Sequence, residues 1–217
     1  MSELKRIYHR RFGTEIELRR AMFDVLCSRV FQEYVPPDAV VLDVGAGYCE
    51  FINSIEARRK IALDLNPDAK QYAAEGVEVH LAPSSSMPFI ESESVDTVFA
   101  SNIFEHLTRE DIGATLREVW RILKKDGHIL ILQPNIRYCY RDYWMFFDHI
   151  TPLDDRSLSE ALEINRFQVV ECRPRFLPYT TKGKLPKSIF LLKVYLMIPL
   201  LHKIFGQQAF IVARKAI

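Results

Sequence analysis

The sequence predicts an α/β domain in which helices cover both faces of a mostly parallel sheet. Short apolar runs bounded by turn residues, such as 40–44 and 95–101, alternate along the chain with segments of helical periodicity. This alternation is typical of strands buried between helices. The first run is followed at once by Gly45 and Gly47 and then by a helical segment over 50–59. In open α/β sheets a nucleotide-like ligand binds at such a turn, at the carboxyl end of the first strand.

The other elements have recognisable starts and stops. An N-terminal helix is expected over 15–34, where apolar residues recur at three- and four-residue steps before a Pro-Pro pair ends it. A later helix is expected between Thr108 as its cap and Gly127 as its stop. Further helices are expected over 67–76 and 157–165, and further strands over 60–64, 77–82, 95–101, 129–132, 167–172 and 209–214. We interpret 1–217 as one domain with an N-terminal helical cap over 1–37, an aromatic segment over 134–152 and an insertion over 174–208.

Three carboxylates near the glycine turn indicate which ligand it binds. A dinucleotide site requires glycine at the sixth position of the turn, where this chain has Glu50, whose charge would repel a pyrophosphate. Asp43 precedes the glycines and suits a cationic group. Asp64 ends the next apolar run, at about the 20-residue spacing of an acid that holds ribose hydroxyls. A ligand with a ribose, a cation and no phosphate is S-adenosylmethionine.

At these motifs the sequence resembles the class I S-adenosylmethionine-dependent methyltransferases, in particular the small-molecule and lipid type similar to the ubiquinone and menaquinone methyltransferases. The resemblance covers roughly 38–173, and its segments are DVGAG at 43–47, ALDLNP at 62–67, VDTVFASN at 95–102, FEHL at 104–107 and LKKDG at 123–127 before HILILQ. It implies a Rossmann-like methyltransferase fold, with a seven-stranded, mostly parallel sheet, an antiparallel last strand and helices on both faces. It also implies S-adenosyl-L-methionine as the cofactor.

The expected cofactor contacts come from the turns at the carboxyl ends of the first four strands. The loop at 83–88 follows the third strand on the ligand face, so its serines can offer hydroxyls and backbone amides to an adenine edge. A polar loop that touches nothing is the alternative. The full set expected to bind the cofactor is Asp43, Gly45, Ala46, Gly47, Tyr48, Asp64, Leu65, Ser84, Ser85, Ser86, Met87, Ser101 and Asn102.

The segment 134–152 carries far more aromatic area than a surface loop needs. Because it follows the fifth strand, it lies over the carboxyl edge of the sheet, and we expect it to form the wall of the acceptor pocket. A short buried helix that only extends the core would explain the same composition. The residues expected to bind the acceptor are Phe104, Tyr138, Tyr143, Trp144 and Phe147.

Methyl transfer from a sulfonium needs an aligned acceptor, and a hydroxyl acceptor also needs a base. His149 and His106 are the candidate catalytic residues, because imidazole titrates near neutral pH. His149 stands beside Asp148, which could orient its ring, while His106 follows the fourth strand. Either histidine could instead be structural, and an acidic phenol or carbanion acceptor would need no strong base. O-methylation is the expected reaction.

Within the insertion, residues 189–201 are almost continuously apolar, although Lys193 and Pro199 interrupt the run. The run is too short to span a bilayer. With its flanking cations it suits a membrane interface over 187–205 or a long-chain acceptor, whereas a plain lid helix would explain the same residues. In the N-terminal cap, Tyr8 and Arg11 could close over the cofactor, or form a solvated basic face.

Composition narrows the partners. The formal net charge is +1, so no basic excess points to nucleic acid, and a small-molecule or lipid- or glycan-linked acceptor remains. Four widely spaced cysteines are typical of reduced thiols in a cytoplasmic protein, and no acid cluster indicates a metal. The alternatives are an inactive methyltransferase-like binding module, and an NAD-dependent oxidoreductase, which Glu50 disfavours. The sequence does not define the oligomeric state.

Overall fold

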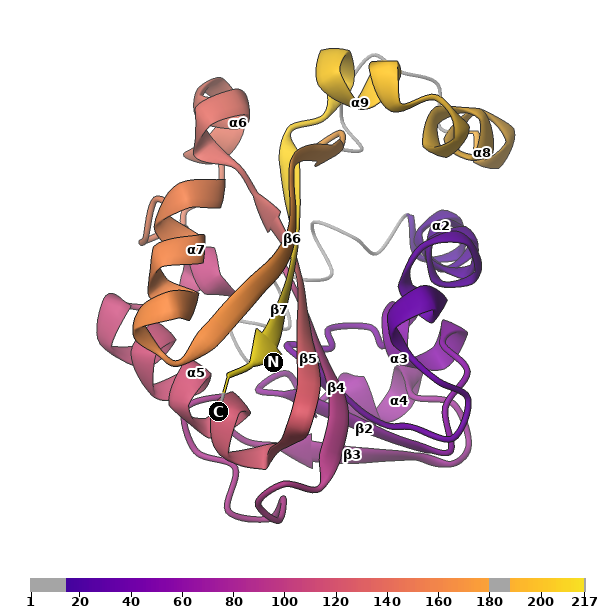
Figure 1. The fold of residues 1–217 in the computed structure, drawn as a ribbon. Helices are drawn as coiled ribbons and strands as arrows, with labels where there is room; N and C mark the ends of the chain where they lie inside the picture. Colours follow the sequence, from indigo (N-terminus) through magenta and orange to yellow (C-terminus); the bar gives the residue numbers. More distant parts are fainter. Residues whose placement is uncertain (1–14, 180–187, 217) are drawn as a thin grey trace.

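The computed structural model describes residues 15–179 and 188–216, which form a seven-stranded sheet covered by helices on both faces (Figure 1). The strand order is β3-β2-β1-β4-β5-β7-β6, and β7 runs antiparallel to both its neighbours while the other adjacent pairs are parallel. The predicted fold is therefore confirmed. The strands are β1 Val40–Val44, β2 Arg59–Asp64, β3 Val77–Leu81, β4 Val95–Ser101, β5 Leu123–Pro134, β6 Phe167–Leu177 and β7 Gln208–Lys215.

Two apolar cores lie on opposite faces of the sheet. Helices α5 (Arg109–Ile122) and α7 (Asp155–Ile164) cover one face, and α2 (Ile16–Arg29), α3 (Glu50–Ser54) and α4 (Ala69–Tyr72) cover the other (Figure 1). β1 is buried along its whole length, and its alternate side chains enter the two cores: Leu42 packs toward α5, and Val41 toward α3. The central strands thus hold the carboxyl edge of the sheet rigidly in place.

Several element boundaries differ from the sequence prediction. α3 ends at Ser54, and the N-terminal helix ends at Arg29, followed by the 3₁₀ turn η1 (Phe31–Tyr34). Thr108 does cap α5, since its hydroxyl oxygen accepts from the Asp111 amide, but α5 ends at Ile122, not at Gly127. Gly127 lies within β5, where a Cβ atom would meet the Asp96 carbonyl oxygen at 3.0 Å. Its lack of a side chain thus serves the close approach of β4 and β5.

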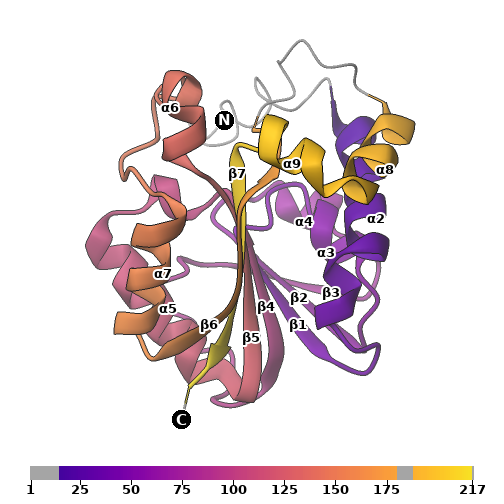
Figure 2. The same cartoon turned by 45° about the horizontal axis from the view of Figure 1, so that its top comes forward.

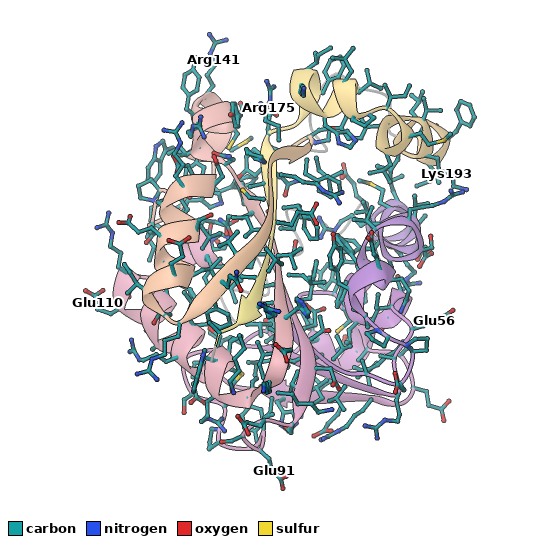
Figure 3. All side chains as sticks on the ribbon, in the orientation of Figure 1. Glu56, Glu91, Glu110, Arg141, Arg175 and Lys193 are labelled. Atoms are coloured by element: carbon teal, nitrogen blue, oxygen red, sulfur yellow. The ribbon has the colours of Figure 1, made fainter. Side chains whose placement is uncertain are left out.

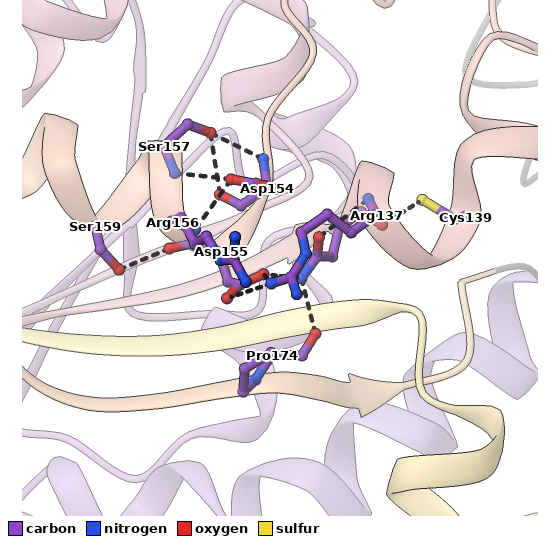
Figure 4. Close-up of polar contacts among 9 residues, drawn as sticks. Arg137, Cys139, Asp154, Asp155, Arg156, Ser157, Ser159 and Pro174 are labelled. Carbon is purple, nitrogen blue, oxygen red and sulfur yellow. Dashed lines mark hydrogen bonds and ion pairs between the residues drawn. The ribbon is translucent and has the colours of Figure 1, made fainter.

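The aromatic segment forms a short helix, α6 (Ile136–Tyr143), which is kinked at Cys139. A polar cluster, in which Asn135 and Asp155 are buried, anchors its first turn to α7 and β6 (Figure 4). Arg137 Nη1 donates to both oxygens of Asp155, at 2.7 and 3.0 Å, and Asn135 Nδ2 donates to Asp155 Oδ1 and to the Pro174 carbonyl. α7 itself begins with a capping box formed by Asp154 and Ser157. The segment between α6 and α7 therefore has an anchored helix at each of its ends.

The insertion begins after Leu177, because β6 continues to pair with β7 as far as Leu177 and Gln208. Its described part is a helical hairpin, α8 (Ile189–Met197) and α9 (Pro199–Phe205), with α8 beside α2 above the carboxyl edge (Figures 1 and 2). No helix within 15–179 or 188–216 is long and apolar enough to cross a membrane.

Candidate active site

A cavity of about 490 Å³ opens at the carboxyl edge of the sheet. Its walls come from the β1–α3 turn, the ends of β2 and β4, the loop after β3, helix α2, and the segment that follows α6. The segments that follow β1 to β5 all leave the sheet at the same edge because these strands are parallel. The edge that the sequence predicts as the ligand site is thus the edge that is hollow.

The β1–α3 turn presses the main chain against the floor of this cavity. Gly45 and Gly47 have φ angles of +72° and +55°, a region that favours glycine. The amides of Gly45 and Ala46 both donate to the Leu63 carbonyl, at 2.8 and 3.1 Å. A Cβ atom on Gly45 would lie 2.8 Å from Ile103 Cδ1. The turn therefore has no room for a side chain at Gly45.

Asp64 is held in place by main-chain donors at the end of β2. The Gly47 amide donates to Oδ2 at 2.7 Å, and the Asn66 amide donates to Oδ1 at 2.6 Å. Burial raises the pKa of this carboxyl, although these amides act in the opposite direction. Asp64 lines the cavity, so an oriented carboxylate lies where the sequence predicts a ribose contact.

The inner end of the cavity is strongly acidic. Asp43 is buried, and burial raises its pKa well above the usual range, with further contributions from Glu50 and Asp64. Glu50 is also buried, and its Oε1 accepts from Arg19 Nε of α2 at 2.6 Å. Two buried carboxyls beside one arginine form a site that a bound cation would stabilise. The carboxylates therefore fit the positively charged part of S-adenosylmethionine and would repel a phosphate.

The loop after β3 contributes only part of the predicted adenine wall. Ser84 and Ser85 line the cavity, and the Ser84 hydroxyl lies 2.8 Å from Thr115 Oγ1. Ser86 is exposed outside it. Met87 also lies outside, because its amide donates to Glu118 and its carbonyl accepts from Arg121, which places its side chain in the core. The prediction is therefore corrected at these two positions.

The acceptor side of the cavity contains a cluster of Glu105, His106 and His149. The Nε2 atoms of both histidines lie 3.9 Å from Glu105 Oε1, and the two rings are 4.8 Å apart between centroids. His106 Nδ1 lies 3.0 Å from the Asp148 carbonyl oxygen and 3.4 Å from Asp148 Oδ2. Because a carbonyl only accepts, this contact places the proton on Nδ1 and leaves the Nε2 lone pair available. Asp148 thus contacts His106, whereas the sequence suggested that it orients His149.

Burial makes the carboxyl of this cluster hard to ionise. Glu105 is almost fully inaccessible, and burial raises its pKa, while the charge of His106 and a hydrogen bond from Gln133 act to lower it. The charged forms of His106 and Glu105 would therefore favour one another, because a positive imidazole lowers the pKa of the buried carboxyl. The three residues also offer one metal-ligating atom each within 4.8 Å of one another, so the cluster could hold a divalent cation.

The residues predicted to bind the acceptor lie elsewhere. Phe104 is fully buried in the core. Tyr143 is buried too, with its hydroxyl donating to the Thr151 carbonyl at 2.6 Å. Tyr138, Trp144 and Phe147 do not line the cavity, and Phe147 is 96% exposed. The same segment instead contributes Phe146, Asp148 and His149, because the turn after α6 rather than the helix itself faces the cavity.

The remaining predicted cofactor residues line the cavity: Gly45, Ala46, Gly47, Tyr48, Leu65, Ser101 and Asn102. Sequence reasoning missed Arg19 and Phe23, which α2 brings over the cavity, and Tyr179, which follows β6. Glu105 was visible only as part of the FEHL segment. The cap residues Tyr8 and Arg11 lie outside the part of the chain that the structure describes.

Comparisons with known proteins concern the fold and the segment 42–131. The family described as "Methyltransferase domain" matches residues 42–131, which contain the glycine turn, Asp64 and the segment after β4. No curated protein matches the chain. Two of the similar solved structures are described as S-adenosylmethionine-dependent methyltransferases. One from Archaeoglobus fulgidus is 22% identical, with a TM-score of 0.69 over 94% of this chain and 99% of that one. One from Methanosarcina mazei is 14% identical, with a TM-score of 0.64 over 87% and 98%.

The methyltransferase-domain match over residues 42–131, together with the fold and the cavity, supports an S-adenosyl-L-methionine-dependent methyltransferase. At these identities the likeness to the solved structures shows the fold alone.

Proposed function

We propose that this enzyme transfers the methyl group of S-adenosylmethionine to a hydroxyl oxygen of a small-molecule or a lipid- or glycan-linked acceptor, with His106 as the base. The observation that carries the proposal is the contact of His106 Nδ1 with the Asp148 carbonyl, which in the neutral ring places the proton on Nδ1 and the lone pair on Nε2. His149 lies against His106 and Glu105, and is the second candidate for the same role.

When bound, the cofactor supplies a methyl group on a positively charged sulfur. Asp64 orients the ribose, and Asp43 and Glu50 favour the cationic end. The acceptor hydroxyl then lies against His106, which takes its proton as the oxygen attacks the methyl carbon. The resulting imidazolium lies between the Asp148 and Glu105 carboxyl groups, which stabilise its charge. S-adenosylhomocysteine, with a neutral thioether sulfur, would be the second product, so charge would be balanced.

The exposed face of the insertion supports contact with an anionic membrane surface in the cytoplasm. Phe190 and Met197 on α8 are 72% and 76% exposed, and Leu200 and Ile204 on α9 are exposed as well. Lys193 extends from α8 into solvent (Figure 3), and Lys203 is exposed on α9. Apolar side chains beside cations suit the headgroup region of an anionic bilayer. The flanking Lys182, Lys184 and Lys187 lie outside the described residues.

A screen with methyl-labelled S-adenosylmethionine tests the proposed reaction. Each hydroxyl acceptor is paired with its amine analogue, and the methylated atom is identified by mass spectrometry. We expect label on oxygen, with turnover unchanged after treatment with a metal chelator. Label confined to nitrogen or carbon contradicts the O-methylation proposal. Loss of turnover on chelation, restored by a divalent cation, would assign Glu105, His106 and His149 to a metal instead.

A further inference from the structure

A second cavity, of about 580 Å³, lies between helix α2, the α8–α9 hairpin, the carboxyl ends of β5 and β6 and the start of β7. We call it the groove. Its volume falls in the range of small-molecule sites, about 300–1,000 Å³. Residues of α2, α8 and α9 line the groove. The insertion therefore encloses a cavity and is more than a lid helix packed closely on the domain. Figure 2 shows α8 and α9 beside α2.

The groove is apolar in effect. Most of its lining is aliphatic or aromatic, chiefly Leu18, Met22, Leu132, Leu177, Leu191, Leu192, Val194 and Leu201. Its two arginines are engaged elsewhere: Arg175 donates to the carbonyls of Gly206 and Ile204 at 2.8 and 2.7 Å, and Arg19 pairs with Glu50. The side chains that remain would gain from covering by another apolar group.

The groove joins the cofactor cavity. Five residues line both: Arg19, Phe23, Ser101, Asn102 and Tyr179. Ser101 ends β4, Asn102 follows it, and both line the cavity that also contains Asp64 and His106. A molecule in the groove can therefore extend one end into the cavity where the methyl group is transferred.

One buried polar side chain lies in the wall of the groove. The Gln208 side chain is more than nine-tenths buried, and its Nε2 donates to the Pro178 carbonyl at 2.8 Å. Its amide is thus held against the end of β6, and the apolar side chains around it make up most of the wall.

We propose that the groove binds the apolar chain of the methyl acceptor. The acceptor is then an amphiphile with its hydroxyl-bearing head near His106 and its chain between α2 and α8. The proposal rests on the proposed function for the identity of the head, but the chain site itself is a binding property. It can be measured without any methyl transfer.

Octyl, decyl and dodecyl maltosides, each kept below its micelle concentration, test the chain site by calorimetric titration into the full chain saturated with S-adenosylhomocysteine. Burial of one methylene group contributes about fourfold in affinity. We therefore expect each two-carbon step to tighten binding by roughly 15-fold. Affinity that does not change with chain length, or no binding, overturns the proposal.

A pair of variants on α8 locates the site. Leu191 lines the groove, whereas Phe190 beside it does not and is largely exposed. Leu191→Trp fills the groove and should weaken dodecyl maltoside binding by at least tenfold, while Phe190→Trp should leave it unchanged. Both should keep the wild-type melting temperature and affinity for S-adenosylhomocysteine. Equal effects of the two variants would contradict a site in the groove.

The proposal that His106 is the base and the proposal that the groove binds an apolar chain can be contradicted separately. His106→Gln should leave the binding of all three maltosides unchanged, because His106 does not line the groove. Chain-dependent binding with no O-methylation of any acceptor would sink the proposed function and keep the chain site. O-methylation with chain-independent binding would do the reverse.

Discussion

The cofactor side and the acceptor side of the active-site cavity are held together by different kinds of contact. On the cofactor side, main-chain amides fix the functional groups: Asp64 accepts from two amides at 2.6 and 2.7 Å, and the glycine turn donates twice to Leu63. On the acceptor side, side chains from distant segments meet: the Nε2 atoms of His106 and His149 each lie 3.9 Å from Glu105 Oε1, and His106 Nδ1 lies 3.4 Å from Asp148 Oδ2. The hydrogen bond in this group runs from His106 Nδ1 to the main-chain carbonyl of Asp148.

This difference implies different responses to mutation. Main-chain groups form the cofactor side, so an added side-chain atom there would clash. The neighbouring strands cannot move aside, because the sheet is close-packed. An acceptor side made of side chains can be changed one residue at a time. Substitutions near Gly45 should therefore abolish cofactor binding, whereas substitutions near the histidines or in the groove should alter rate or preference and leave the cofactor bound.

The largest effect is expected for Gly45→Ala. The new methyl group would lie 2.8 Å from Ile103 Cδ1 in a backbone conformation with φ of +72°. Relief requires either the turn or Ile103 to move into the cofactor space, so the affinity for S-adenosylhomocysteine should fall on the order of 100-fold or more. Calorimetric titration of the folded variant measures this.

Gly76 is the matched control for this change. It also has a positive φ, +84°, but a Cβ there would meet nothing within 4 Å. Gly76→Ala should cost about 1–2 kcal/mol of stability from backbone strain alone and leave cofactor affinity unchanged. Replacing Ile103 by Ala as well should restore part of the affinity lost in Gly45→Ala. If both single glycine variants bind the cofactor equally well, close packing at the turn is not what shapes the site.

The next effect is expected for Asp64→Ala. Loss of hydrogen bonds from the ribose to a buried carboxylate costs roughly 1.5–3 kcal/mol. The affinity for S-adenosylhomocysteine should therefore fall on the order of tenfold to hundredfold. The affinity for dodecyl maltoside should not change, since Asp64 does not line the groove. A folded variant with an unaltered dissociation constant would remove Asp64 from the site.

A smaller effect should separate the two faces of α8. Leu196 packs against the core, so Leu196→Asp should lower the melting temperature by roughly 4–8 °C. Met197 is 76% exposed, so Met197→Asp should keep the melting temperature and lose sedimentation with anionic vesicles. Salt should weaken the vesicle binding of the unchanged protein, because such attraction is screened over roughly 8–10 Å. If the unchanged protein fails to sediment at any salt concentration, the outer face does not contact membranes.

The smallest effect concerns pH and Asp43. Its pKa is raised in the folded chain by burial and by Glu50 and Asp64, so above about pH 4 the folded state binds more protons than the unfolded state. Stability from this group is complete below the unfolded pKa and is lost as pH rises through the folded pKa. The neutral variant Asp43→Asn lacks this loss. The melting temperature of the unchanged protein minus that of the variant should therefore fall from pH 5 to pH 7. A constant difference would contradict a raised pKa.

Local motifs made the cofactor side predictable from the sequence. Asp43, Gly45, Gly47 and Asp64 lie at the ends of two adjacent strands, so their spacing along the chain fixes their position in space. The mostly parallel sheet with an antiparallel last strand also follows from the motifs and the resemblance. The same reasoning failed at Met87, because the side chains of Glu118 and Arg121, about 30 residues away, turn its loop toward α5.

The residues of the acceptor side could not be predicted from local motifs, because they come together only through long-range packing. The segment at 134–152 was recognised by its aromatic content, yet Trp144 and Phe147 face outward while Phe146 and His149 face the cavity. The kink at Cys139 and the anchor at Arg137 decide this, and neither has a local signature. Arg19 reaches the cavity through its pair with Glu50, 31 residues away.

The most direct test of the proposed mechanism is the rate of methyl transfer in His106→Gln, measured in single turnover with a hydroxyl acceptor and labelled S-adenosylmethionine. Removing the base should lower the rate by about 10² or more, abolish its rise with pH over the range in which imidazole loses its proton, and leave the affinity for S-adenosylhomocysteine unchanged. His149→Gln should have the smaller effect on the rate. An unchanged rate in His106→Gln, or a larger loss in His149→Gln, would contradict the assignment of His106 as the base.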